Sequence, residues 1–553
     1  MMQSEPIHAA RPSHPEAGAP AQHDSAAPLQ TSAPASRTLV KSGYPALAGK
    51  AVLEVAKAQT RRWDLALTRV RHEQERVLLD IVRHAKNTSF GVARDFAGIR
   101  DYRDFAASVP IGDYDSFSPF IERMRRGEKN LLVPEFVRYY GNSSGTSTNG
   151  RSKFLPITER QVALQRKAGT DGLFRTLAML SDDTFPAGFT IGLFPPTTMK
   201  VEGPVLITSN PALMSARMPL FTKPNYLPDE ECKRMADYDA KLARIAEKYI
   251  DYDVRALAGT TCWFTLMFEK LLAEARRRGR SERTVSQIWP NLRMLLGGGV
   301  SADPYLPVIR DMMGRSDVLL VDTYNATEGG IYASSDHSGE PGMLMQPHRG
   351  TFFEFVPLEE NDSPNPTRVP LWEVELGKPY VILVTTVSGL YAYKLGDIVR
   401  FPRRNRMEYV GRLSGCLSVT QELTTHVEVE KAVASAIGRV PCTTVDFGVS
   451  AEIGAKSRYM LFVEFVPGKG PADRDAFARA FDEGMCEQNR VYREHRKGDV
   501  AILAPHVVVL QEGGARRYLD QVTRGNMQGK FPRIIDPSRK AQVLAFAESG
   551  AFS

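Results

Sequence analysis

Residues 141–156 read Gly141-Asn142-Ser143-Ser144-Gly145-Thr146-Ser147-Thr148-Asn149-Gly150-Arg151-Ser152-Lys153-Phe154-Leu155-Pro156. Glycine allows backbone N–H groups to point at an anion, and serine and threonine hydroxyls add further donors. Lys153 supplies a mobile positive charge. The stretch is therefore typical of a loop that binds a triphosphate.

The same stretch is also compatible with a polar surface hairpin, because serine, threonine, glycine and asparagine are common in turns. It differs from the nucleotidase P-loop, since no Gly-Lys pair followed by Ser or Thr occurs in it. The preceding residues, Val137-Arg138-Tyr139-Tyr140, predict a strand. We therefore expect the loop to lie between strands or to open onto one.

Length and composition bound the class of protein. At 553 residues the chain is long enough for two or three domains. A hydrophobic content of 42% and a charged content of 24% are ordinary for a soluble globular protein. The net charge of +7 is small, and the basic run Arg276-Arg277-Arg278-Gly279-Arg280 follows a helical pattern, which predicts a solvated helix C-terminus. We expect small anionic substrates, such as ATP or a carboxylic acid, and no nucleic acid.

The cysteines indicate the compartment. Five cysteines lie far apart without any Cys-x-x-Cys pair, and their odd number argues against a disulfide framework. No apolar run has the length of a membrane span, and the first residues lack the features of a signal peptide. We expect a cytoplasmic monomer without a membrane partner.

The pattern of apolar residues divides the chain. Residues 1–37 are rich in Ala, Pro, Ser and His without periodicity, which predicts a disordered tail. Apolar residues at three-and-four spacing predict helix from about residue 44 to residue 84. Strand 292–296, helix 305–313 and strand 318–322 predict a βαβ unit in a partly parallel sheet.

Three motifs after apolar strands could serve a nucleotide. Gly297-Gly298-Gly299 permits close approach by a flat ring, or simply forms a turn before a helix capped by Ser301 or Asp303. Asp322-Thr323-Tyr324-Asn325-Ala326-Thr327-Glu328 offers a ring for a base and a carboxylate for Mg²⁺, or a core tyrosine and a solvated acid. Asp397, after Gly396, can accept two ribose hydroxyls or form an ordinary turn.

The order of the motifs is more specific than any one of them. The hydroxyl loop, the glycine run, Tyr…Thr-Glu-Gly, Tyr-x-x-Gly-Asp, Gly411-Arg412 and Gly529-Lys530-Phe531-Pro532-Arg533 follow one another as in adenylate-forming enzymes. More closely, the chain after about residue 45 resembles the Gretchen Hagen three family of acyl acid–amido synthetases. The resemblance extends to Asn87-Thr88-Ser89-Phe90-Gly91, Ile288-Trp289-Pro290-Asn291-Leu292 and Phe353-Glu354-Phe355-Val356-Pro357-Leu358.

The resemblance implies an α/β fold, with a large N-terminal adenylating domain of mixed sheets and a smaller mobile α+β C-terminal domain. We place the disordered tail at 1–37, the ATP- and acid-binding domain at 38–415 and the mobile lid at 416–553. The site is expected between the two domains.

The resemblance also implies roles for single residues. The β- and γ-phosphates would be bound by Ser143, Ser144, Gly145, Thr146, Ser147 and Lys153. The adenine would lie along Gly298 and Gly299 and stack on Tyr324.

The remaining implied roles concern the reacting atoms and the ribose. Thr327 would contact the α-phosphate and Glu328 would hold Mg²⁺. Asp397, helped by Arg412, would hold the ribose hydroxyls. Lys530 would swing in and neutralise the charge that develops at the α-phosphate.

The chain departs from the family pattern in three places. The phosphate loop is one residue longer between Ser147 and Lys153, and Lys394 replaces an arginine, which loses bidentate geometry. The residues Thr420-Gln421-Glu422-Leu423 stand where a Gly-Glu-Lys-like hinge is usual.

The implied reaction activates a carboxylic acid with Mg-ATP as an acyl-adenylate and transfers the acyl group to an amine, which we expect to be that of an amino acid. A thiol acceptor, such as coenzyme A or a carrier protein, is an alternative. A non-catalytic ATP-binding relative is a further alternative, although Glu328, Asp397 and Lys530 are all present.

Overall fold

A computed structural model describes residues 38–42, 44, 46–146, 152–218, 220–299, 302, 306–415, 417, 419, 422, 424–452, 457–489, 492, 493, 496–499, 502–523 and 530–548. Val40–Ser553 forms one compact unit, distinct from Met1–Leu39. The predicted tail 1–37 and the predicted helix caps Ser301 and Asp303 lie outside the described residues.

The first helical region contains two long helices rather than an uninterrupted one. The break falls at Arg69, whose φ of −124° and ψ of 35° are not helical. After α2, Thr88 caps a further short helix by accepting a hydrogen bond from the Gly91 N–H. The helices before residue 126 are α1 (Ala46–Thr68), α2 (Val70–Ala85), α3 (Ser89–Ala93), α4 (Tyr102–Ser108) and α5 (Tyr114–Arg125).

The largest sheet has eight strands and is antiparallel throughout. Side chains of α2, α3, α4 and α5 pack against it in the largest apolar core. Two of its strands, at residues 351–357 and 379–386, are almost wholly buried, and apolar residues in them follow one another instead of alternating with polar ones. In spatial order the strands are β10 (Thr323–Ala326), β11 (Gly330–Ser334), β12 (Met343–Met345), β17 (Arg406–Arg412), β16 (Tyr393–Arg403), β15 (Pro379–Thr386), β13 (Thr351–Pro357) and β14 (Val369–Pro370).

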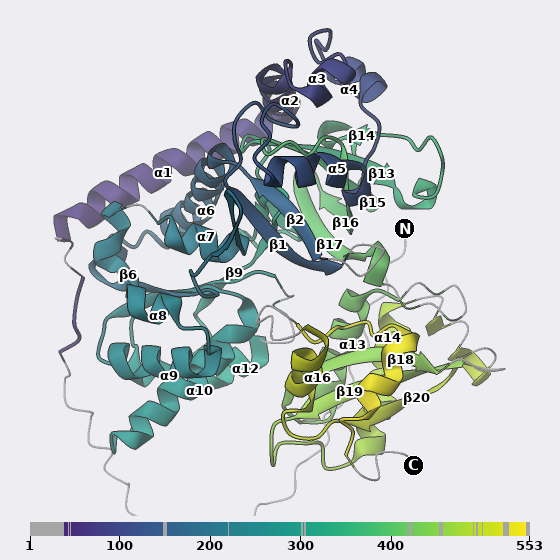
Figure 1. Cartoon of the computed structure of the whole chain (residues 1–553). Helices are drawn as coiled ribbons and strands as arrows, with labels where there is room; N and C mark the ends of the chain where they lie inside the picture. The colour runs from purple at the N-terminus through teal and green to yellow at the C-terminus, as the bar shows by residue number, and fades with distance from the viewer. Residues whose placement is uncertain are drawn as a thin grey trace, which may run out of the picture. The chain divides into compact units, whose positions relative to one another are not determined.

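A second sheet has five parallel strands and contains the predicted βαβ unit, which is confirmed (Figure 1). In spatial order its strands are β6 (Tyr226–Leu227), β3 (Phe189–Leu193), β7 (Val254–Gly259), β8 (Met294–Leu296) and β9 (Leu319–Val321). One face packs on α9 (Tyr238–Tyr249), α10 (Thr261–Arg277), α11 (Val285–Ile288) and α12 (Leu306–Met313). The other face packs on α1 and α6 (Glu159–Leu180).

A smaller sheet carries the hydroxyl-rich stretch. Its spatial order is β2 (Ser152–Ile157), β1 (Tyr139–Thr146), β5 (Val205–Thr208) and β4 (Lys200–Glu202). The strand predicted at residues 137–140 continues into the hydroxyl-rich residues, and β1 and β2 form an antiparallel hairpin. Two short helices lie nearby in the sequence, α7 (Asn210–Ala216) and α8 (Glu230–Arg234).

The last part of the chain has its own sheet and its own apolar cores. Its strands lie in the order β18 (Thr444–Glu452), β19 (Ser457–Phe465) and β20 (Ile502–Val509). The helices of this part are α13 (His426–Arg439), α14 (Arg474–Gln488), α16 (Gly514–Thr523) and α17 (Lys540–Leu544).

The predicted fold class, α/β with mixed sheets, is confirmed by these sheets. The domain boundaries at residues 37 and 415 and the mobility of the C-terminal part stay predictions. Within the described residues, no helix is both long and apolar enough to cross a bilayer.

One buried side chain joins α2 to the eight-stranded sheet. Gln74 Nε2 donates hydrogen bonds to the carbonyl oxygens of Pro347 (2.6 Å) and Thr351 (3.0 Å), and its Oε1 accepts one from the Phe353 N–H (2.8 Å). The amide is fully buried, so no water can replace these bonds.

We predict that Gln74→Leu lowers the free energy of unfolding by about 3 kcal/mol or more, because each buried group left unpaired costs about 1–3 kcal/mol. Urea unfolding followed by circular dichroism would measure the change. Arg83→Gln, exposed on the same helix, should change the value by less than about 0.5 kcal/mol. Equal stability of Gln74→Leu and the native protein would contradict the prediction.

Candidate active site

A large cavity opens at the carboxyl ends of the parallel strands. Phe194 follows β3, Thr260 follows β7, Gly297 follows β8 and Asp322 follows β9, and all four line it. This edge of a parallel sheet is where α/β proteins bind ligands. The cavity volume of about 2900 Å³ exceeds the roughly 300–1,000 Å³ typical of one small-molecule site. More than one substrate can therefore be accommodated.

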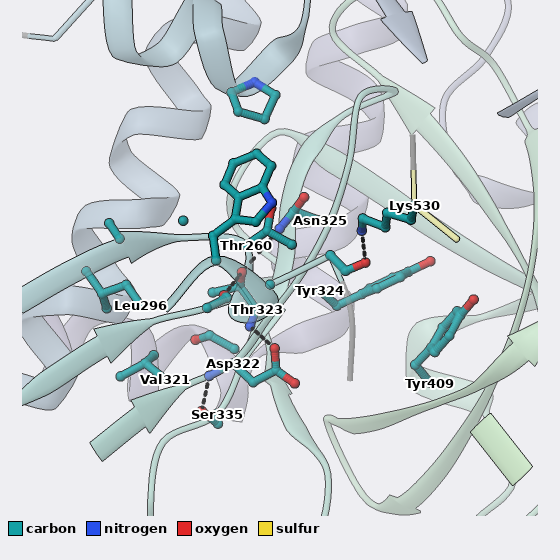
Figure 2. Close-up of a pocket in the computed structure, with 18 of the residues that line it drawn as sticks. Thr260, Leu296, Val321, Asp322, Thr323, Tyr324, Asn325, Ser335, Tyr409 and Lys530 are labelled. Atoms are coloured by element: carbon teal, nitrogen blue, oxygen red, sulfur yellow. Dashed lines mark hydrogen bonds between the residues drawn. The ribbon is translucent and has the colours of Figure 1, made fainter. Parts of the chain in front are cut away.

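The glycine run lines this cavity where no side chain would fit. A Cβ atom at Gly298 would lie 2.6 Å from Thr323 Oγ1, and Gly299 has a φ of +78°. Thr323 Oγ1 donates a hydrogen bond to the Gly297 carbonyl oxygen over 2.8 Å, and Figure 2 shows Thr323 at the centre of the pocket wall. Backbone therefore forms the wall here, as a flat ring requires.

Tyr324 combines features of both interpretations that the sequence allowed. It lies in β10, its ring is buried in the main core, and it also lines the cavity (Figure 2). Its Oη donates a hydrogen bond to Asp397 Oδ2 over 2.7 Å. The Tyr409 ring lies beside it, with 5.8 Å between the ring centroids.

Asp397 is a buried carboxylate held by two partners. Besides the Tyr324 hydroxyl, Arg412 Nε lies 3.0 Å from Asp397 Oδ1, because Asp397 in β16 and Arg412 in β17 are register partners. Burial raises the pKa of Asp397, whereas Arg412 and the Tyr324 hydroxyl act in the opposite direction. A carboxylate has about four lone-pair positions, so it can still accept hydrogen bonds from a ligand.

Thr327 and Glu328 form the turn between β10 and β11. The turn is tied to α6, because Gln161 Nε2 donates a hydrogen bond to the Thr327 carbonyl oxygen over 3.0 Å. Ser388 Oγ in turn donates to Gln161 Oε1. Gln161 is fully buried, and sequence reasoning missed it, because nothing around it resembles a binding motif.

Glu328 fits the role of a metal ligand that shares the ion with a substrate. Burial raises the pKa of its carboxyl, and within the described residues no ion pair engages it. Within the same residues no group of three or more His, Cys, Asp or Glu side chains could hold a metal ion. Mg²⁺ commonly binds through one or two carboxylates and substrate phosphates. The residues present therefore fit Mg²⁺ bound together with phosphate.

The predicted phosphate loop is the tip of the β1–β2 hairpin. The backbone of Ser143, Ser144, Gly145 and Thr146 forms the end of β1, and Ser147 lies outside the described residues. Ser143 is the register partner of Lys153 in β2. The hairpin is thus observed, and its role in phosphate binding stays a prediction.

Residues from the C-terminal part also line the cavity. Lys530 Nζ donates a hydrogen bond to the Gly299 carbonyl oxygen (Figure 2). His426, the first residue of α13, packs its ring on Tyr409 with 5.1 Å between the centroids. Sequence reasoning missed His426, and it included Arg533 in a motif without giving it a role.

Where the structure describes the departures from the family pattern, they form contacts of their own. Lys394 Nζ points to Asn361, with 3.2 Å to Asn361 Oδ1, and not to Asp397. Of the unusual hinge residues, Glu422 is described: it is buried and accepts a hydrogen bond from the Tyr459 hydroxyl over 2.7 Å. Thr420, Gln421 and Leu423 lie outside the described residues.

The cavity brings together residues that the resemblance to adenylate-forming enzymes predicts. Models of the GH3 family N-terminal, central and C-terminal domains match residues 59–186, 344–407 and 427–539. The chain belongs to the GH3 family.

Known proteins agree with this assignment. The jasmonoyl–L-amino acid synthetase JAR4 of Nicotiana attenuata is 32% identical over 552 residues, which cover 85% of this chain and 92% of the relative. The indole-3-acetic acid-amido synthetase GH3.3 of Arabidopsis thaliana is 23% identical, with 84% and 89% covered.

Solved structures share the fold. The GH3.15 acyl acid amido synthetase superposes with a TM-score of 0.71 at 19% identity, covering 90% of this chain and 96% of that one. A 2-hydroxyisobutyryl-CoA ligase in its postadenylation state gives a TM-score of 0.51 at 12% identity, with 93% and 97% covered.

We predict that acid destabilises the protein through His426. Burial lowers the pKa of His426 to about 4, and the charges of Arg533, Arg412 and Lys530 act in the same direction. Between the ordinary pKa of about 6.5 and this value, the unfolded state binds more protons, so stability falls as pH falls.

Urea unfolding at pH 7.5 and pH 5 would test this prediction. His426→Asn, which cannot titrate, should lose less stability than the native protein over this interval. His72→Asn is a matched control, because the His72 side chain is 74% exposed. An equal loss in the native protein and His426→Asn would show that His426 is not responsible.

Proposed function

We propose that the protein is an ATP-dependent acyl acid–amido synthetase. In the first half-reaction a carboxylate oxygen attacks the α-phosphorus of ATP, and pyrophosphate leaves. In the second half-reaction an amine attacks the carbonyl carbon of the acyl-adenylate and loses a proton, and AMP leaves. The adenylate is itself the activated intermediate, so no protein nucleophile is required.

The observation that supports this proposal most strongly is the convergence of separate segments on one cavity. The glycine run after β8, the turn after β10, Asp397, Arg412 and Lys530 all line it. They span more than two hundred residues of sequence, from Gly297 to Lys530. Positioning and charge stabilisation are what phosphate-centred chemistry demands of a protein.

We assign the nucleoside to the side of the cavity that holds Tyr324 and Asp397. The adenine lies against the backbone of Gly298 and Gly299 and stacks on the Tyr324 ring. The ribose hydroxyls donate to Asp397, whose orientation is already fixed by Tyr324 and Arg412.

We assign the phosphates to the opposite side. Thr327 contacts the α-phosphate, and the β- and γ-phosphates are bound by the hairpin residues Ser143, Ser144, Gly145, Thr146 and Ser147 with Lys153. Mg²⁺, when bound between Glu328 and the phosphates, supplies positive charge that offsets the developing negative charge. The buried Glu328 carboxylate is oriented by the turn that Gln161 holds.

Lys530 completes the site in the first half-reaction. Its ammonium group would leave the Gly299 carbonyl oxygen and pair with the α-phosphate and the carboxylate. This requires the C-terminal part, residues 416–553, to act as a mobile lid. The lid would adopt one orientation for adenylate formation and another for amine transfer.

The acid is proposed to carry an apolar body. The cavity wall between α6 and the five-stranded sheet consists of apolar side chains, among them Leu173, Leu177, Phe185 and Val321. An amine acceptor, and an amino acid in particular, is supported by the relatives, which are amido and amino acid synthetases.

We also propose a cytoplasmic monomer, in agreement with the cysteine pattern. Cys232, Cys442 and Cys486 are free thiols. Burial raises the pKa of each of them to about 11, so they are poorly reactive at neutral pH.

Product analysis distinguishes the possible acceptors. The protein is supplied with ATP, a panel of aromatic and aliphatic acids, and either amino acids or coenzyme A, and products are identified by mass spectrometry. We expect pyrophosphate release to depend on the acid and an amide to form. A thioester without any amide would overturn the proposed acceptor class.

Asp397→Ala should weaken ATP binding about tenfold or more, because a hydrogen bond to a charged group contributes about 1.5–3 kcal/mol. Calorimetric titration with ATP would measure the affinity. Asp397→Asn keeps the shape and controls for misfolding, and Asp475→Ala is an exposed control. Unchanged affinity in Asp397→Ala would remove this residue from the nucleotide site.

Lys530→Ala should slow adenylate formation by about a hundredfold or more and leave ATP affinity within about threefold, because a charge that acts in the transition state alters rate rather than binding. Exchange of radiolabelled pyrophosphate into ATP would measure the first half-reaction. Amide formation from supplied acyl-adenylate should survive. Lys497→Ala, exposed in the same part of the chain, is the control; native exchange in Lys530→Ala would refute the assignment.

A further inference from the structure

Tyr114, at the beginning of α5, contacts the strand that carries Lys153. Its Oη accepts a hydrogen bond from the Phe154 N–H over 3.0 Å. The Lys153 ammonium lies 5.7 Å from the centroid of the Tyr114 ring, within the range of cation–π attraction. One side chain therefore contacts both the backbone of β2 and the charged end of the neighbouring lysine.

The same end of α5 is attached to β16, the strand of Asp397. The Gly112 N–H donates to the Ala392 carbonyl oxygen (3.1 Å), and the Lys394 N–H donates to the Gly112 carbonyl oxygen (2.8 Å). Asp113 caps α5 in a capping box, which fixes where the helix begins and hence where Tyr114 stands.

The other end of α5 also contacts β2, the strand that carries Lys153. The guanidinium of Arg125 lies 4.0 Å from the centroid of the Phe154 ring and forms an ion pair with Glu202 in β4. Both ends of α5 thus contact β2. The helix links the proposed ribose side of the site to the proposed phosphate side.

The charge of Lys153 acts within the site. Burial raises the pKa of both Glu328 and Asp397, and the positive charge of Lys153 acts in the opposite direction on each. An ammonium group on a flexible four-carbon stem is costly to immobilise, so its binding to phosphate benefits from a partner that already holds it in place.

We propose that Tyr114 is a positioning residue whose ring holds the Lys153 ammonium ready for the triphosphate. This inference rests on the proposed function, in which Lys153 contacts the β- and γ-phosphates. Since the ring acts on ground-state binding, its loss should raise KM for ATP and leave kcat nearly unchanged.

The test is a double-mutant cycle read by acid-dependent ATP–pyrophosphate exchange. We expect Tyr114→Leu to raise KM for ATP about fivefold and Tyr114→Phe, which keeps the ring, to remain within about twofold of the native value. In a Lys153→Met background, Tyr114→Leu should have no further effect, because the ring acts through the lysine. Effects that simply multiply, or a Tyr114→Phe variant as impaired as Tyr114→Leu, would overturn the proposal.

If Tyr114→Leu does not fold, phenylalanine analogues with increasing numbers of fluorine atoms can be placed at position 114 instead. Fluorination preserves ring size and weakens the attraction for a cation, so KM should rise with each fluorine. A KM independent of fluorination would overturn the proposal. If the native protein shows no acid-dependent exchange, the proposed function itself is refuted. If the native protein shows exchange and Lys153→Met has the same KM for ATP, the role of the lysine is refuted.

Discussion

The hydrogen bond between Tyr324 and Asp397 is the contact on which the geometry of the site depends. Tyr324 lies in β10, an edge strand, and Asp397 lies in β16, four positions away in the sheet. Flat strands in these positions would be about 19 Å apart, at about 4.8 Å per strand. A direct bond therefore requires the sheet to curl until its edge faces its own middle. The same curl brings the Tyr409 ring of β17 beside the Tyr324 ring.

Much of this arrangement could be predicted because local patterns determined it. The apolar strands on either side of α12 predicted the parallel βαβ unit, and the glycines after β8 predicted a part of the wall that is formed by backbone. The order of short motifs identified the family, because few folds would place these motifs in one sequence. Gly298, Tyr324 and Asp397, which line the cavity, were among the predicted residues, since they lie within the motifs or directly after strands.

Contacts between segments far apart in sequence were not predictable. Gln161 contacts Thr327, and Tyr114 contacts Lys153. Both lie in helices whose sequences show only ordinary amphipathic or capping patterns. The break between α1 and α2 at Arg69 was missed because the helical spacing of apolar residues continues across it, whereas the backbone at Arg69 is not helical. His426 carries no motif, and its environment consists of charges contributed by β17 and the C-terminal segment.

Helix α6 serves two parts of the cavity with two well-separated stretches. Its first turn holds the Thr327 carbonyl oxygen through Gln161, and Leu177, sixteen residues on, belongs to the apolar wall. At about 1.5 Å per residue these positions are about 24 Å apart. Evolution or directed engineering can therefore reshape the proposed acid pocket by exchanging side chains late in the helix, while the contact of its first turn with Thr327 stays unchanged. With the assignments proposed above, one continuous helix would let the range of acids diversify independently of the residues that bind ATP.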